Sequence, residues 1–166
     1  MNPAARAALR SLLLTDAQFV ADMQALRLGA GNEQVIPRVL DGNRRFDQIG
    51  AEHLPCWIND AGDMTASDAG NEGGGMDGMV IGSSQQDWAG DIELSLLWMQ
   101  QDVARSVEQT DAIPAALVRL LLRNPSLGES CTLARVVELQ TDRNVRHPTH
   151  YLYARLRINT TIERTG

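Results

Sequence analysis

The 166 residues are 43% hydrophobic and 22% charged, which suits a single globular domain spanning residues 1–166. All 15 basic residues are arginine, which excludes P-loop nucleotide hydrolases, Schiff-base enzymes and protein kinases because each needs a lysine. The net charge of -6 argues against a broad phosphate-binding surface. No apolar run approaches the roughly 18 to 20 residues of a membrane span, and no secretory signal is evident. We therefore expect no membrane partner and assembly in the cytoplasm.

The first predicted element is a helix from Pro3 to Leu28, because apolar residues recur there at steps of three and four. Gly29 and the small residues after it end the helix. Thr15-Asp16 is an alternative break between two shorter helices.

Two short strands are predicted next. Gln34 to Leu40 is the first, and Pro37 confines it to a sheet edge or a bulge. His53 to Asn59 is the second.

Residues 60–78 are rich in Gly, Asp, Asn and Ser and predict a long acidic loop that contacts a partner or stays disordered. The spacing of its acidic residues does not fit an EF-hand calcium loop. Residues 73–78 match G-x-G-x-x-G, but neither a strand before them nor a helix after them is predicted, so no dinucleotide site is expected. The candidate partner-contacting residues of this loop are Asp60, Asp63, Asp68, Glu72 and Asp77.

A polar turn from Gln85 to Gly90 is expected to lead into a strand at Asp91–Met99, with Ile92, Leu94, Leu96 and Trp98 on one face. A helix follows from Asp102 to Arg123. Pro114 predicts a kink in it, or a restart capped by Asp111. The expected apolar side of this helix consists of Val103, Val107, Ile113, Leu117, Leu120 and Leu121.

The C-terminal region predicts two strands of similar length, Leu133–Gln140 and Tyr151–Ile162, joined by a polar loop. Apolar and polar residues alternate along the last strand, so one of its faces is core and the other polar. The element order predicts an α+β fold: a mostly antiparallel sheet of four or five strands with two main helices packed on one face.

No motif in the sequence is a strong indication of a catalytic or metal-binding site. Cys56 and Cys131 are expected to be buried reduced thiols, with a disulfide as the alternative. His53, His147 and His150 are expected in turns or at the surface, since Pro148 prevents the last two from sharing a helical face. No nucleophile motif is present. We therefore predict no enzyme, with no catalytic, cofactor-binding or metal-ligating residues and no cofactor.

The polar face of the C-terminal strands is the candidate site. Tyr and Arg are enriched at protein interfaces, and Arg pairs with carboxylates through a planar fork. Ordinary cross-strand pairing on a solvated face is the alternative. The candidate subunit-interface residues are Glu93, Glu138, Gln140, Tyr151, Tyr153, Arg155 and Arg157.

The second half of the chain resembles the tail terminator and minor tail proteins of long-tailed bacteriophages of the lambda type. The resemblance rests on the strand Asp91–Trp98, the segment Asp111–Leu117, the turn Asn124–Gly128, and the strands ending Glu138–Asp142 and running Tyr151–Ile158. With the N-terminal helix and Leu54-Pro55, it covers about two thirds of the chain. Residues 60–78 and Pro114 depart from the family's layout.

This resemblance implies a structural virion protein at the head-proximal end of the tail. Its subunits would form a ring, typically a hexamer, that caps the tail tube and joins it to the head. The implied partners are copies of itself, the tail-tube protein and a head-completion or neck protein, while DNA passes through the lumen without specific binding. The alternatives are a head–tail connector or tail-completion subunit, a small enzyme with a dispersed active site, and a cytoplasmic ligand-binding module.

Overall fold

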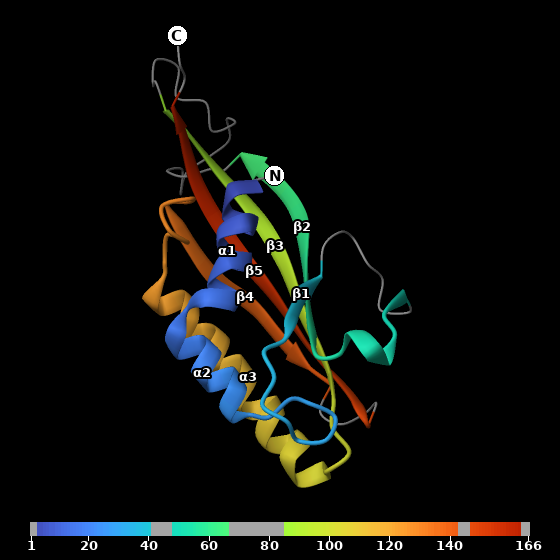
Figure 1. Cartoon of the computed structure of the whole chain (residues 1–166). Helices are drawn as coiled ribbons and strands as arrows, with labels where there is room; N and C mark the ends of the chain where they lie inside the picture. The colour runs from blue at the N-terminus through green and yellow to red at the C-terminus, as the bar shows by residue number, and fades with distance from the viewer. Residues whose placement is uncertain (1–2, 41–47, 67–84, 143–146, 164–166) are drawn as a thin grey trace.

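The computed structural model describes residues 3–40, 48–66, 85–142 and 147–163, with backbone alone at 60–66, 85–87 and 162–163. Five strands form one sheet in the order β1-β2-β3-β5-β4, which places β1 and β4 at opposite edges (Figure 1). β1 pairs parallel with β2 and the other neighbours pair antiparallel, so the sheet is mixed. The strands are β1 (Arg38–Leu40), β2 (Cys56–Ala66), β3 (Gln85–Met99), β4 (Leu133–Thr141) and β5 (Thr149–Glu163).

Three α-helices, α1 (Pro3–Thr15), α2 (Ala17–Ala25) and α3 (Val103–Arg123), lie along one face of this sheet (Figure 1). A short 3₁₀ helix at Ala51–His53 precedes β2. The main core lies between the helices and the sheet, and it includes Leu9, Phe19 and Leu117 from the helices. From the central strands it takes Ile92, Leu94, Leu96, Trp98, Leu152, Ala154, Leu156 and Ile158. The predicted α+β class is confirmed, with three helices instead of two.

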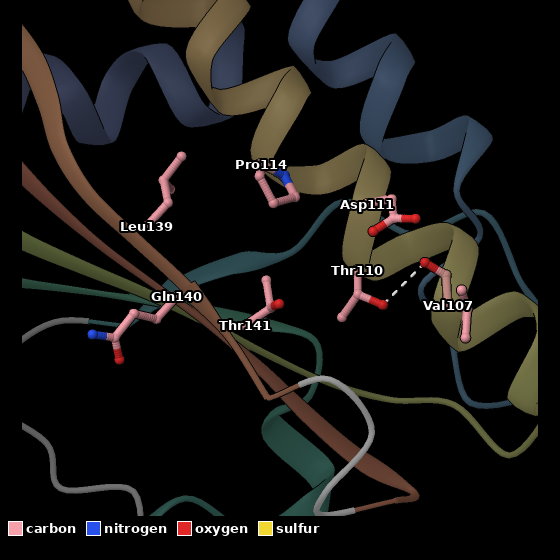
Figure 2. Close-up of a pocket in the computed structure, with 7 residues that line it drawn as sticks. All are labelled: Val107, Thr110, Asp111, Pro114, Leu139, Gln140 and Thr141. Carbon is pink, nitrogen blue, oxygen red and sulfur yellow. Dashed lines mark hydrogen bonds between the residues drawn. The ribbon is translucent and has the colours of Figure 1, made fainter.

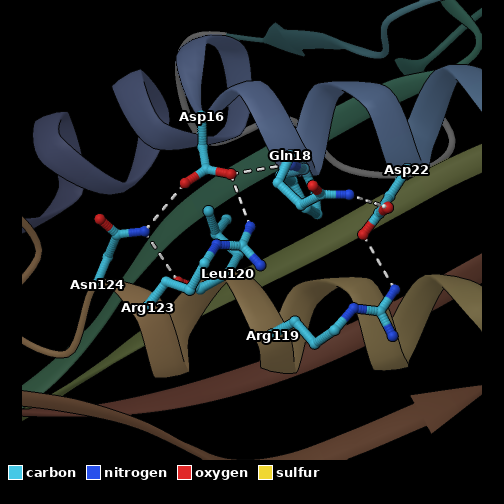
Figure 3. A network of polar contacts seen from close by, with 8 residues as sticks. Asp16, Gln18, Asp22, Arg119, Leu120, Arg123 and Asn124 are labelled. Carbon is cyan, nitrogen blue, oxygen red and sulfur yellow. Dashed lines mark hydrogen bonds and ion pairs between the residues drawn. The ribbon is translucent and has the colours of Figure 1, made fainter.

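Asp16 separates α1 from α2, so the predicted break at Thr15-Asp16 is confirmed and a continuous helix to Leu28 is wrong. The Asp16 carboxylate caps α2 by accepting a hydrogen bond from the Phe19 amide at 2.9 Å. It also binds the Arg123 guanidinium at 2.7 Å and the Asn124 amide at 3.2 Å (Figure 3). A second pair joins Asp22 to Arg119 at 3.0 Å. These contacts join the start and middle of α2 to the second half of α3.

Residues 60–66 correct the predicted loop, because they form the second half of β2. Asp60 pairs with Glu93 and Ala66 pairs with Trp88, with a register shift between Ala61 and Met64. The predicted polar turn at 85–90 is likewise strand, since β3 begins at Gln85 and pairs there with β5. Backbone hydrogen bonds to a neighbouring strand outweigh the low strand propensity of Gly and Asp in both segments. Residues 67–84, which hold the rest of the predicted loop and the G-x-G-x-x-G match, lie outside the described residues.

The long helix α3 runs unbroken through Pro114, so the predicted restart at Asp111 is wrong. The Asp102 carboxylate caps it by accepting from the amides of Ala104 and Arg105. Burial of Ile113, Leu117 and Leu120 holds the helix across the proline. Val103 and Val107 were predicted on its apolar side but are 58% and 46% exposed. Both lie in the first half of α3.

The short edge strand and the two C-terminal strands follow the predictions closely. β1 is an edge strand, as Pro37 required, although it covers residues 38–40 alone. β4 and β5 pair antiparallel over most of β4, with a register shift between Val136 and Glu138. Both cysteines are buried and free, so the predicted reduced thiols are confirmed.

Candidate subunit interface

The sheet face opposite the helices collects all seven predicted interface residues, and we call it the open face. Arg155 on β5 lies between Glu93 on β3 and Glu138 on β4. Tyr153 lies between Ser95 and Gln140 in the same register. Strand alternation places Tyr151 and Arg157 on this side too, because every second residue of a strand faces the same way.

Two ion pairs cross the open face. Arg155 Nη2 lies 3.1 Å from Glu138 Oε2, and Arg157 binds Asp91 through two nitrogens, with Nη2 3.2 Å from Oδ2. The hydrogen bond and charge of Asp91 raise the pKa of Arg157 further. The side chains of Arg155 and Arg157 remain 41% and 40% exposed, so a partner can still reach both. The predicted cross-strand neighbours are therefore in contact, and their role in an interface stays a prediction.

Tyr153 is the half-buried aromatic residue near the centre of the open face. Burial raises the pKa of its hydroxyl, and the charge of Glu93 and its hydrogen bond with the tyrosine add to this shift. Tyr153 is thus held as a neutral donor beside a carboxylate.

One end of the open face is apolar. Cys56, Ile58 and Leu97 form a small buried cluster that is separate from the main core. Leu40, Ile49, Leu54 and Tyr151 pack against it. The side chains of the open face are therefore apolar near β1 and β2 and form ion pairs near β4.

Asp91 is a member of the open face that sequence reasoning missed. It lies two residues before Glu93 on the same strand, so strict alternation puts both carboxylates on one side. That signal was available, but the residue was taken as the first of its strand.

The structure describes only part of the predicted partner-contacting loop. Asp60 and Asp63 belong to β2, where the backbone alone is described. Asp68, Glu72 and Asp77 lie outside the described residues.

His150 is fully buried, which corrects its predicted place in a turn or at the surface. It occupies β5 two residues before the core residue Leu152, and the same alternation turns its ring inward. Its Nδ1 lies 3.4 Å from Asp142 Oδ2, and its ring packs 5.5 Å from that of Trp98. Both side chains of this His–Asp pair are buried.

Two grooves flank the edges of the sheet. One of about 760 Å³ lies between α3 and β4 and is lined by Val107, Thr110, Asp111, Pro114, Leu139, Gln140 and Thr141 (Figure 2). The other, of about 200 Å³, lies beside α1 and β1 and is lined by Pro3, Arg6, Ala7, Arg10, Val39, Leu40 and Asn59. In the larger groove, Asp111 is the ionisable side chain among the lining residues. The residues that line this groove therefore do not include both an acid and a base for proton transfer.

Within the described ranges, no three His, Cys, Asp or Glu side chains are grouped so that they could hold a metal ion. Over the same part of the chain, no helix combines the length and the apolar character needed to cross a membrane.

Comparisons with known proteins add no assignment. No model of a known protein family matches the sequence, and no curated protein matches it significantly.

Proposed function

We propose that this chain is a structural subunit of the tail-terminator type, which assembles with copies of itself into a ring that caps a phage tail tube. The observation that carries the proposal is the open face, where tyrosine, arginine and carboxylate side chains from three adjacent strands share one surface that α1, α2 and α3 do not cover. The order of secondary structure elements in the sequence supports the same class.

Tyr151 and Tyr153 supply the aromatic area that an interface core needs, and Arg155 and Arg157 supply fork-shaped donors beside it. Exposed ion pairs such as Arg155–Glu138 contribute only about 0 to 1 kcal/mol to folding. The two ion pairs on this face therefore suit recognition of a partner more than they stabilise the subunit.

A ring fits the overall charge of the chain as well. A head-to-tail interface that closes on itself makes a ring of fixed size. A net charge of -6 per subunit favours an acidic lumen through which DNA passes without adhering. The proposed location is the head-proximal end of the tail in the virion, between the tail-tube protein and a neck protein.

A head–tail connector or tail-completion subunit is the second candidate, because it would use the same open face in a ring at the neck. The two differ in what the ring binds. A terminator ring binds the end of a tail tube, whereas a connector ring binds the head portal.

The test is the variant Arg155→Glu, assayed for assembly alone and with tail-tube protein by negative-stain imaging. This change puts three carboxylates in adjacent register positions with Glu93 and Glu138. We expect the fold to persist while rings on tube ends are lost.

Arg119→Glu is the matched control. It breaks a comparable exposed pair, Arg119–Asp22 at 3.0 Å, on the helix side of the molecule. This control should assemble normally. Normal ring formation by Arg155→Glu, or equal loss in both variants, would contradict an interface on the open face.

A further inference from the structure

The two edges of the sheet carry complementary surfaces. Because β1 and β4 end the strand order, each has one side without a neighbouring strand in the described structure. Such edges are templates for pairing with another chain unless they are blocked. The grooves described above lie at these two edges, one beside β4 and the other beside β1.

The β4 edge combines apolar and acidic side chains. Val107 on α3 and Val137 on β4 are 46% and 40% exposed, and Pro114 and Leu139 line the groove between these elements. Asp111 lies at this groove, and Glu108 is exposed one helical turn before it. Neither carboxylate has an ion pair with another described residue.

The β1 edge combines apolar and basic side chains. Ile36, just before the strand, is 40% exposed, and Val39 and Leu40 are half-buried. Arg38 is exposed between them and makes no ion pair within the described part of the chain. The backbone amide of Arg38 is already used, since it donates to the Pro55 carbonyl at 3.1 Å on the β2 side.

We propose that the β1 edge of one copy docks into the α3–β4 groove of a second copy. Ile36 would enter the apolar part of the groove, and Arg38 would pair with Asp111 and Glu108. This inference rests on the proposed function, which is that the chain assembles with copies of itself. It adds which surfaces of two neighbouring copies meet, and therefore how each copy is oriented relative to the next.

The difference between the two edges determines whether copies join head to tail or as a two-fold pair. A surface that meets its own copy closes a two-fold pair, whereas two different complementary patches repeat head to tail. Like edges also repel each other here, because Arg38 would face Arg38, or Asp111 would face Asp111. The edge contact therefore favours head-to-tail assembly, which includes the proposed ring, over a symmetric dimer.

The experiment is a charge-reversal cycle measured by sedimentation velocity over a dilution series. Arg38→Glu and Asp111→Arg should each raise the concentration at which half of the chain is assembled by at least about tenfold, the effect of one close interfacial charge pair. The double variant Arg38→Glu/Asp111→Arg should recover most of this loss, because the pair is restored with its signs exchanged.

Glu129→Arg is the control, since it makes the same charge change at an exposed residue outside the groove. Circular dichroism checks that every variant is folded. If the wild type assembles and the single reversals change nothing, or the double variant does not recover, the edge contact is wrong and the proposed function stands. If the wild type stays monomeric alone and with tail-tube protein, both fail.

Discussion

Tyr153 and Glu93 form the most informative pair of residues on the open face. The hydroxyl is half-buried beside a carboxylate, and both features favour the neutral phenol. Because the pKa in the folded chain is above the ordinary value of 10.0, the stability linked to Tyr153 is complete below pH 10 and is lost as the pH rises through the folded pKa.

We predict that Glu93→Gln shifts the ionisation of Tyr153 to lower pH, because the neighbouring negative charge is removed. Tyrosinate absorbance during an alkaline titration measures the shift. The chain has two tyrosines, so the difference between each protein and its Tyr153→Phe counterpart isolates the Tyr153 signal. An unchanged titration would mean that Glu93 does not contribute to the raised pKa of Tyr153.

On the helix side of the sheet, Asp16 is a second residue whose pKa is shifted by its contacts. Partial burial raises the pKa of its carboxyl, but hydrogen bonds from the Phe19 amide, Arg123 and Asn124 outweigh this and lower the pKa overall. The same carboxylate therefore caps α2 and binds the C-terminal end of α3.

Replacing Asp16 by alanine should lower the free energy of unfolding by about 1 to 2 kcal/mol, since it removes a helix cap and a partly exposed ion pair. Urea unfolding measures this loss. Asp16→Asn keeps a side-chain oxygen for the cap and loses the ion pair, so we expect it to lose less than half as much. Equal losses in the two variants would assign the effect to the charge alone.

At the scale of elements, the sequence predicted strands well where alternation was strong. Leu152, Ala154 and Leu156 alternate with Tyr153 and Arg155, and the observed register follows that pattern. The same rule, applied strictly, would have put Asp91 on the open face and His150 in the core.

Other elements were hidden from sequence reasoning because their cause is tertiary. Residues 60–66 and 85–90 have turn-like compositions, yet both become strand because neighbouring strands complete their backbone hydrogen bonding: 60–66 pair with β3, and 85–90 pair with β5. Pro114 stays inside α3 because packing of Ile113 and Leu117 offsets the lost hydrogen bond. Val103 and Val107 fit the apolar periodicity of α3 but are exposed, because periodicity does not show how much of a helix the sheet covers.

The sequence predicted which residues form the candidate site but not which of them lie next to one another. The alternation identified seven polar residues, and the register then brought Glu93, Arg155 and Glu138 side by side. The edge grooves had no sequence signal, because each depends on how a helix packs beside an edge strand.

At the scale of the whole molecule, the described structure has α1, α2 and α3 on one face of the sheet (Figure 1). The open face is covered at its apolar end and partly exposed over its ion pairs, and the two dissimilar edges have no further described strand. These surfaces suit a subunit more than a chain that acts alone. The open face offers contact area to a partner. The two unlike edges would set the orientation of one subunit relative to the next. These surfaces are the basis of the proposal that the chain acts by assembling with copies of itself at the end of a tail tube.

Sedimentation velocity of the purified wild-type chain, alone and mixed with tail-tube protein, tests this claim most directly. We predict one closed species whose mass is a small whole-number multiple of the subunit, forming alone or on the tube ends, and no open-ended series of sizes. A single subunit that persists at high concentration and ignores the tube protein would contradict the account.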